Sequence, residues 1–142
     1  MMKRETIIQS QTLGELGRKE LLVFGAACTE RLLPNYTHFT QQLNWGNTVV
    51  LRQSLDLIWK HIEDSADIIN ISELKQEIDA NTPNTEDFES ELASFALDAT
   101  TAVYELLNYF ESSQLQSIID ISTVSFDTVD MFIQIKENLD PR

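Results

Sequence analysis

The sequence contains only four glycines, three prolines and one cysteine among its 142 residues. So few helix-breaking residues argue against an all-β or loop-rich fold and favour long helices. No apolar run reaches the roughly 18 residues of a membrane span, and the N-terminal MMKRETIIQSQT lacks the apolar core of a secretion signal. Cys28 alone cannot form an internal disulfide, which is typical of a reducing compartment. We therefore expect a cytoplasmic protein with no membrane segment.

Acidic residues outnumber basic ones, and the imbalance lies in the second half of the chain. The net charge is −13. Residues 1–60 carry seven basic and five acidic side chains, a net charge of +2, whereas residues 61–142 carry three basic and eighteen acidic ones, a net charge of −15. Nucleic-acid binding is disfavoured, because phosphate contacts need a basic surface. The acidic half either serves solubility or forms a face that docks a basic partner.

Apolar residues recur at helical spacing along most of the chain, and no segment alternates as a strand does. The clearest helix covers residues 47–64, with Asn47 as its expected N-cap. Its apolar stripe is Leu51, Leu55, Ile58 and Ile62, flanked by Trp59. The sequence predicts an all-α fold, an irregular bundle of five to six helices. We expect a single helical domain over residues 1–142, with residues 1–11 as a flexible leader.

Proline sets one expected boundary early in the chain. A first helix can start at Thr12, which fits a capping box, or at Arg18. It should stop at Leu33, because Pro34 lacks an N–H and restricts the residue before it. Pro34 would then open a short helix over residues 35–43. Three later helices are expected. A short one is capped by Asn70 or Ser72 and ends at Ala80, and a long one starts at Asn84 or Thr85. The last one covers residues 114–139.

Several segments resemble one bacterial family. They are ERLLPNYTHFTQQLNWGN and LDLIW, followed by ALDATTAVYELL and TVSFDTVDMF. The family is the YjaG-like family, known as domain of unknown function 416, and the resemblance covers roughly residues 13–135. It implies a compact helical bacterial protein with no assigned reaction.

The sequence departs from the family pattern in two respects. Many members have a cysteine where this chain has Thr40. Members also continue for several tens of residues beyond the last matching segment, so a further C-terminal helix after residue 142 is expected to be missing here. One of two apolar stripes on the 114–139 helix would then need a partner subunit as its cover. That stripe, the second, is Ile121, Val124, Met131, Ile135 and Leu139; the first is Leu115, Ile118, Ser122, Phe126, Val129 and Phe132/Ile133.

A polar cluster is expected around the Pro34 corner. Its members are Glu30, Arg31, Asn35, Tyr36, Arg52 and Asp56. Glu30 would lie at a helix C-terminus, where the helix dipole disfavours an anion, so it should pair with Arg52 or Lys60. Asp56 has Arg52 four residues before it and Lys60 four residues after it, a ladder of charges on the flank of the helix. The preferred interpretation is that the cluster locks the corner; the alternative is a ligand-binding or catalytic site.

No catalytic residue, cofactor or metal site is predicted. Glu91, Asp98 and Glu105 share one helix face, but the Glu-x-x-His motif of di-iron bundles is absent. This face should therefore be a solvated or arginine-paired ridge. His38 and His61 lie on different segments and lack zinc-ligand spacing. Nucleophile motifs and a phosphate-binding glycine loop are also absent from the sequence.

We therefore expect a non-enzymatic helical domain that binds a protein or associates with itself. The contact with a partner or with a second copy would use the 114–139 helix. The alternative is a small enzyme or ligand-binding domain with its site at the Glu30–Tyr36 corner. A deep pocket there, with polar groups converging on it, would favour the alternative.

Overall fold

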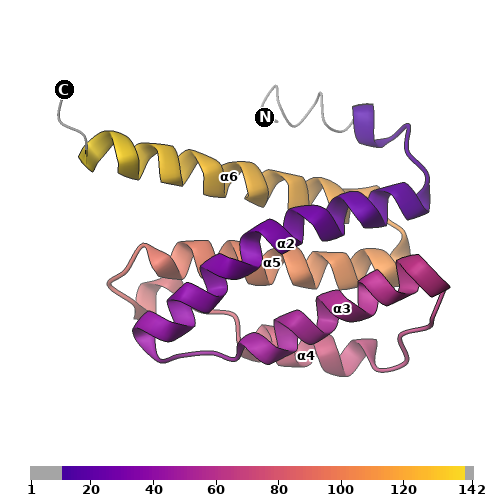
Figure 1. Cartoon of the computed structure of the whole chain (residues 1–142), viewed down its shortest axis with the longest axis horizontal. Coiled ribbons are helices and arrows are strands. Elements are labelled where there is room, and N and C mark those ends of the chain that lie inside the picture. Colours follow the sequence, from indigo (N-terminus) through magenta and orange to yellow (C-terminus); the bar gives the residue numbers. More distant parts are fainter. Residues whose placement is uncertain (1–10, 140–142) are drawn as a thin grey trace.

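The computed structural model describes residues 11–139, with side chains described up to Thr128 and again at Ile133. Within this range lie five complete α-helices and one 3-10 helix, and no residue forms a strand. The elements are α2 (Arg18–Leu43), α3 (Thr48–Asp64), α4 (Ile71–Ala80), η1 (Thr85–Asp87), α5 (Leu92–Ser112) and α6 (Leu115–Leu139). The predicted all-α bundle of five to six helices is confirmed (Figure 1). The predicted leader, residues 1–11, lies outside the described residues except for its last residue.

α2 is one continuous helix that passes through Pro34, so the predicted stop at Leu33 and the separate helix over residues 35–43 are wrong. An internal proline costs a helix roughly 3 kcal/mol, because it removes a hydrogen bond and crowds the preceding turn. Burial on both sides of the proline offsets this cost, since each large apolar side chain contributes about 1.5–3 kcal/mol. The residues concerned, all at most 8% exposed, are Leu32, Leu33, Tyr36 and Phe39.

The connection from α2 to α3 is held by Tyr36. Its hydroxyl accepts a hydrogen bond from the N–H of Asn47 at 3.2 Å and donates one to the carbonyl of Asn81 at 2.7 Å. Gly46 lies against this hydroxyl with φ +89°, and a β-carbon at that position would overlap the Tyr36 oxygen. Asn47 caps α3 as predicted, because its side-chain oxygen accepts from the N–H of Val49 at 2.9 Å. Tyr36 therefore joins α2 to the start of α3 and the end of α4.

α5 begins later than the predicted start at Asn84 or Thr85, so that boundary is wrong. The preceding segment forms η1 and then an extended residue, Phe88, with φ −130° and ψ 129°. In this conformation the Phe88 ring packs 5.1 Å from the ring of Phe39 and 5.6 Å from that of Trp45, measured between centroids. Helical geometry through Phe88 would move its ring out of this aromatic cluster, and the tertiary contact prevails over the local helix signal.

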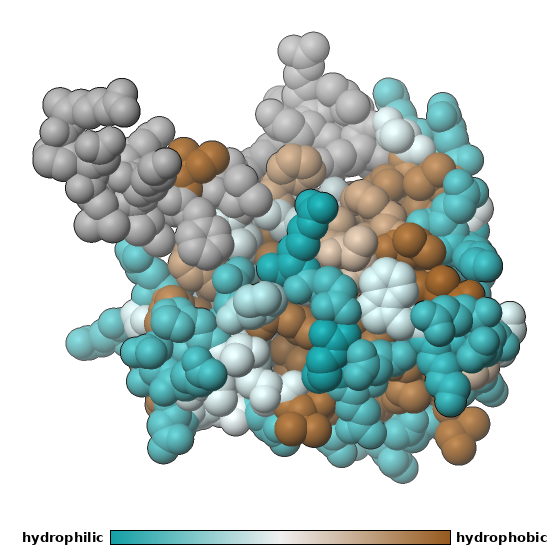
Figure 2. Space-filling model, viewed as in Figure 1, coloured by the Kyte–Doolittle hydropathy of each residue, from teal (hydrophilic) through white to brown (hydrophobic). Residues whose placement is uncertain are grey.

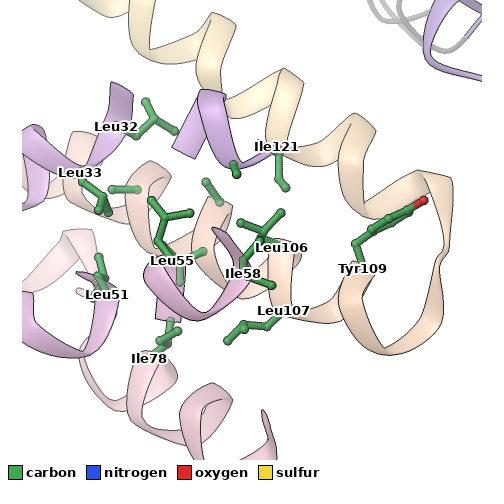
Figure 3. Packing of buried hydrophobic residues seen from close by; sticks show 14 of the residues in the cluster. Leu32, Leu33, Leu51, Leu55, Ile58, Ile78, Leu106, Leu107, Tyr109 and Ile121 are labelled. Atoms are coloured by element: carbon green, nitrogen blue, oxygen red, sulfur yellow. The ribbon is translucent and has the colours of Figure 1, made fainter. Parts of the chain in front are cut away.

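α5 contacts each of the other four helices, and α2 also packs on α3 and α6, while α4 packs on α3 and α5. Gly25 of α2 lies so close to α5 and α6 that a β-carbon there would be 3.0 Å from Leu106 and 3.1 Å from Ile118. Figure 3 shows side chains from α2, α3, α4, α5 and α6 meeting in one apolar cluster. Labelled members are Leu32, Leu55, Ile58, Ile78, Leu106 and Ile121. Among the described residues, no helix is long and apolar enough to cross a membrane.

The described apolar side chains of α6 are buried near its start and exposed further along. Ile118 and Ile121, at the start of its two predicted stripes, are completely buried. Phe126 and Ile133, further along the first stripe, are 53% and 49% exposed. The side chains of Met131, Ile135 and Leu139, from the second stripe, lie outside the described ones.

Replacing Pro34 with alanine should stabilise the protein. Pro34 is exposed, so its removal leaves the core intact, and the new N–H restores one helical hydrogen bond. We expect the free energy of unfolding in urea to rise by about 1–2 kcal/mol, which is the helix penalty less the entropy that proline removes from the unfolded chain. The exposed Arg31→Ala variant in the same helix serves as the control, with a change below about 0.5 kcal/mol. A loss of stability in Pro34→Ala would contradict the view that the proline destabilises α2.

Replacing Gly46 with alanine should destabilise the protein. The positive φ and the overlap with the Tyr36 hydroxyl both act against a β-carbon, so we expect a loss of about 2–4 kcal/mol by urea denaturation. The Gly17→Ala variant is the matched control, because φ at Gly17 is −76° and its β-carbon would meet only the Glu20 carboxylate, at 3.4 Å. Equal effects in the two variants would contradict the role given to the Tyr36 junction.

Candidate functional site

A groove of about 1120 Å³ lies between α2 and α3. Its floor is apolar and comes from both helices: Leu33, Tyr36, Leu51 and Leu57. Pro34 and Val49 add exposed apolar surface, and Val49 is 65% exposed. The edges carry mostly polar side chains, namely Glu30, Thr37, His38, Gln41, Thr48, Arg52, Gln53, Asp56 and Lys60. In Figure 2 brown apolar atoms show between teal ones over the α2–α3 side of the molecule.

Glu30 and Arg52 form the strongest polar contact along the groove. Two guanidinium nitrogens of Arg52 donate to the two Glu30 carboxylate oxygens at 2.9 and 2.6 Å, a bidentate pair. The Nε of Arg52 also donates to Asp56 at 2.9 Å. The indole N–H of Trp59 donates to Glu30 at 2.9 Å. The network therefore ties α2 to α3 across the groove.

These contacts shift the acid–base behaviour of both partners. The hydrogen bond from Arg52 is the largest cause that lowers the pKa of Glu30; partial burial opposes it and the Trp59 N–H reinforces it. Glu30, in turn, is the main reason that the pKa of Arg52 is raised. The Arg52 and Glu30 side chains are 44% and 37% exposed, so water screens the pair and its contribution to stability is about 1 kcal/mol.

The structure brings four of the six predicted cluster residues to the groove: Glu30, Tyr36, Arg52 and Asp56. The pairing of Glu30 with Arg52 and the Arg52–Asp56 ladder are confirmed. The premise for Glu30 was wrong, however, because it lies in the interior of α2 and not at a helix end. Arg31 is exposed and Asn35 partly buried, and neither lines the groove. Arg31 instead lies near Cys28, whose thiol has its pKa raised by burial and lowered slightly by Ser125 and Arg31.

The predicted acidic ridge divides into three different environments. Asp98 is half-buried, so it is only partly solvated, and it accepts a 2.7 Å hydrogen bond from the Thr128 hydroxyl of α6, not from an arginine. Burial raises its pKa, Thr128 lowers it and the nearby Asp127 raises it. Glu105 accepts from the Asn108 amide at 3.0 Å, and Glu91 precedes α5 as its N-cap residue. Among the described residues, no group of three acidic, histidine or cysteine side chains is placed to hold a metal.

Sequence reasoning missed one residue that lines the groove, Val49, and one that hydrogen-bonds to its Glu30, namely Trp59. Trp59 was interpreted only as a flank of the apolar stripe, although a partly buried indole N–H usually finds an acceptor and Glu30 needed donors. Val49 was not singled out, yet it lies off the buried stripe of its helix. An apolar residue outside the core face is the available signal for an exposed apolar site.

The fold and the groove define an all-α protein with an open groove between two neighbouring helices. Residues 9–141 match the family described as "Protein of unknown function (DUF416)", and the chain belongs to that family. The uncharacterized protein YjaG of Escherichia coli is 31% identical over 111 residues, which are 78% of this chain and 57% of that relative. An uncharacterized protein of Haemophilus influenzae is 26% identical over 121 residues, 84% of this chain and 62% of that one.

A solved structure agrees with this assignment. The crystal structure of a DUF416 family protein from Shewanella baltica OS155 matches with a TM-score of 0.85 and 30% sequence identity, over 94% of this chain and 68% of that chain. The resemblance seen in the sequence is therefore confirmed. The chain spans 57% of the length of YjaG and 62% of the Haemophilus influenzae relative.

Replacing Glu30 with glutamine should weaken the protein in a pH-dependent manner. Folding lowers the pKa of Glu30 below the usual 4.5, so its contribution is present above about pH 4.5 and is lost as the pH falls through the lowered value. We expect Glu30→Gln to cost about 1 kcal/mol of unfolding free energy at pH 7 and less at pH 3, because the carboxylate takes up a proton as the pH falls below 4.5. Urea denaturation at both pH values measures this.

The control is Glu63→Gln, a change at an exposed position of the neighbouring helix. We expect it to alter stability by less than about 0.5 kcal/mol. A deficit in Glu30→Gln that is equal at both pH values would contradict the role of the ionised carboxylate.

Proposed function

We propose that this chain is a non-enzymatic protein-binding module whose α2–α3 groove docks a helix of a partner protein. The observation that carries the proposal is the groove itself, with an apolar floor, polar edges and the 65% exposed Val49. An amphipathic helix laid into a hydrophobic groove is a recurring mode of peptide recognition. An exposed apolar surface bordered by polar residues is typical of such interaction sites.

The dimensions of the groove suit a short helix. Its α2 edge extends from Glu30 to Gln41, a distance of roughly 16 Å at 1.5 Å per residue, or three helical turns. α2 and α3 are joined by the short connection of residues 44–47 and run in opposite directions side by side (Figure 1). A third helix can therefore pack along both, with apolar residues at i, i+3 or i+4 and i+7 facing the floor.

The polar groups of the groove favour binding over catalysis. Glu30, Arg52 and Asp56 hydrogen-bond to one another, and Trp59 donates to the same Glu30 oxygen that accepts from Arg52. An acid or base of this kind is held by its partners and not aimed at a reacting group. Specificity would instead come from the shape of the floor and the charges along the edges. A small-molecule ligand in the same groove is the second candidate, because four of the predicted cluster residues line the groove.

Selection from a displayed library of 14-residue helical peptides tests the proposal. We expect selected peptides to share apolar residues at i, i+3 or i+4 and i+7, and to lose at least tenfold in affinity for Val49→Asp. Val49 lies in the first turn of α3, where an acidic residue is compatible with the helix dipole, so the variant should fold. Fluorescence anisotropy with labelled peptides gives the affinities.

The matched control is Ile69→Asp. Ile69 is an apolar residue that is 92% exposed and does not line the groove, so its substitution should leave peptide affinity unchanged. Recovery of no peptide above background, or equal binding to Val49→Asp and the wild-type chain, would contradict the proposal.

A further inference from the structure

The exposed face of α6 is a second apolar surface, separate from the α2–α3 groove. Phe126 and Ile133 are 53% and 49% exposed. They are seven residues apart in one helix, so they lie about two turns apart on the same face. Neither residue lines the groove. Figure 1 shows the yellow C-terminal part of α6 at the edge of the bundle.

The helix that carries this face is acidic. Over Leu115–Leu139, α6 has four acidic residues and one lysine, namely Asp120, Asp127, Asp130, Glu137 and Lys136. Asp120 and Asp127 are also seven residues apart, so they form a row parallel to the apolar one. Asp98 of the neighbouring α5 accepts a hydrogen bond from Thr128, and burial and, to a smaller degree, the negative charge of Asp127 raise its pKa. The chain from residue 61 onward has a net charge of −15.

We propose that the Phe126–Ile133 face of α6 docks a cationic amphipathic helix of a partner protein. Apolar residues of the partner would cover Phe126 and Ile133, and its lysine or arginine side chains would lie along the acidic row of Asp120 and Asp127. Complementary charge of this kind steers association and selects the partner. This surface differs from the groove, so the inference goes beyond the proposed function and does not depend on it.

Charge also decides against two other occupants of this face. A second copy would place two acidic helices against each other between chains that each carry −13, and like charges at close range repel. An anionic lipid surface would be repelled for the same reason. A helix with an apolar stripe and basic flanks is complementary to both the apolar row and the acidic row of the face.

Two synthetic 18-residue helices that share one leucine face test the inference, one with lysine and one with glutamate on its polar face. Isothermal titration with the full chain at 50 and 300 mM salt measures binding. We expect the lysine peptide to bind at least 100-fold more tightly than the glutamate peptide. Its affinity should fall about tenfold or more as the salt concentration rises, because the contact is partly electrostatic.

The decisive variant is Phe126→Ser/Ile133→Ser, which removes the apolar row and leaves every charge in place. We expect it to lose at least tenfold in affinity for the lysine peptide while its circular dichroism remains helical, because both side chains are half-exposed. The matched control is Val49→Ser in the α2–α3 groove, which should keep wild-type affinity.

Three results would overturn the inference. Equal affinity in the double variant would show that only bulk charge attracts the peptide. Loss of affinity in Val49→Ser would place the peptide in the α2–α3 groove, which would support the proposed function but not this one. A concentration-dependent dimer of the wild-type chain that is lost in the double variant would identify a second copy as the occupant of the face.

Discussion

The burial of α2 is the constraint on which the rest of the structure depends. This helix contacts α3, α5 and α6, and its buried residues lie on both sides of Pro34. A helix that ended at the proline would withdraw Tyr36 and Phe39 from the core, at a cost of about 1.5–3 kcal/mol for each side chain. The two losses together, about 3–6 kcal/mol, equal or exceed the roughly 3 kcal/mol that the proline costs the helix. The packed core thus determines the path of the backbone where local preference would break it.

The continuity of α2 also creates the groove. Because the helix does not turn at Pro34, Glu30 and Gln41 lie along one edge, opposite the polar side of α3. The Glu30–Arg52 pair fixes that edge near the middle of α2, and the Tyr36 hydroxyl fixes the loop end of the α2–α3 pair through Asn47. The polar network predicted as a corner lock is therefore one of two ties that hold the helices on either side of an apolar floor.

The sequence was sufficient for the parts of the fold that local patterns encode. The helical stripe of α3, its Asn47 cap and the Glu30–Arg52 pair follow from periodicity and charge, and the structure confirms them. The sequence-based predictions are wrong where residues distant in the sequence determine the local structure. Phe88 is extended because its ring packs on Phe39 and Trp45, whose positions a single sequence does not give. The groove depends on how two helices lie together, so only four of its lining residues were predicted as a cluster, namely Glu30, Tyr36, Arg52 and Asp56.

Amide hydrogen exchange along α2 tests the central claim most directly. If core packing carries the helix through Pro34, amides of residues 36–41 should exchange only through the opening that exposes those of residues 22–32. Their protection should then agree within about tenfold, and both sets should lose it together as urea is added. Protection of residues 36–41 that is about 100-fold weaker and insensitive to urea would show a separate, fraying segment and would contradict the account.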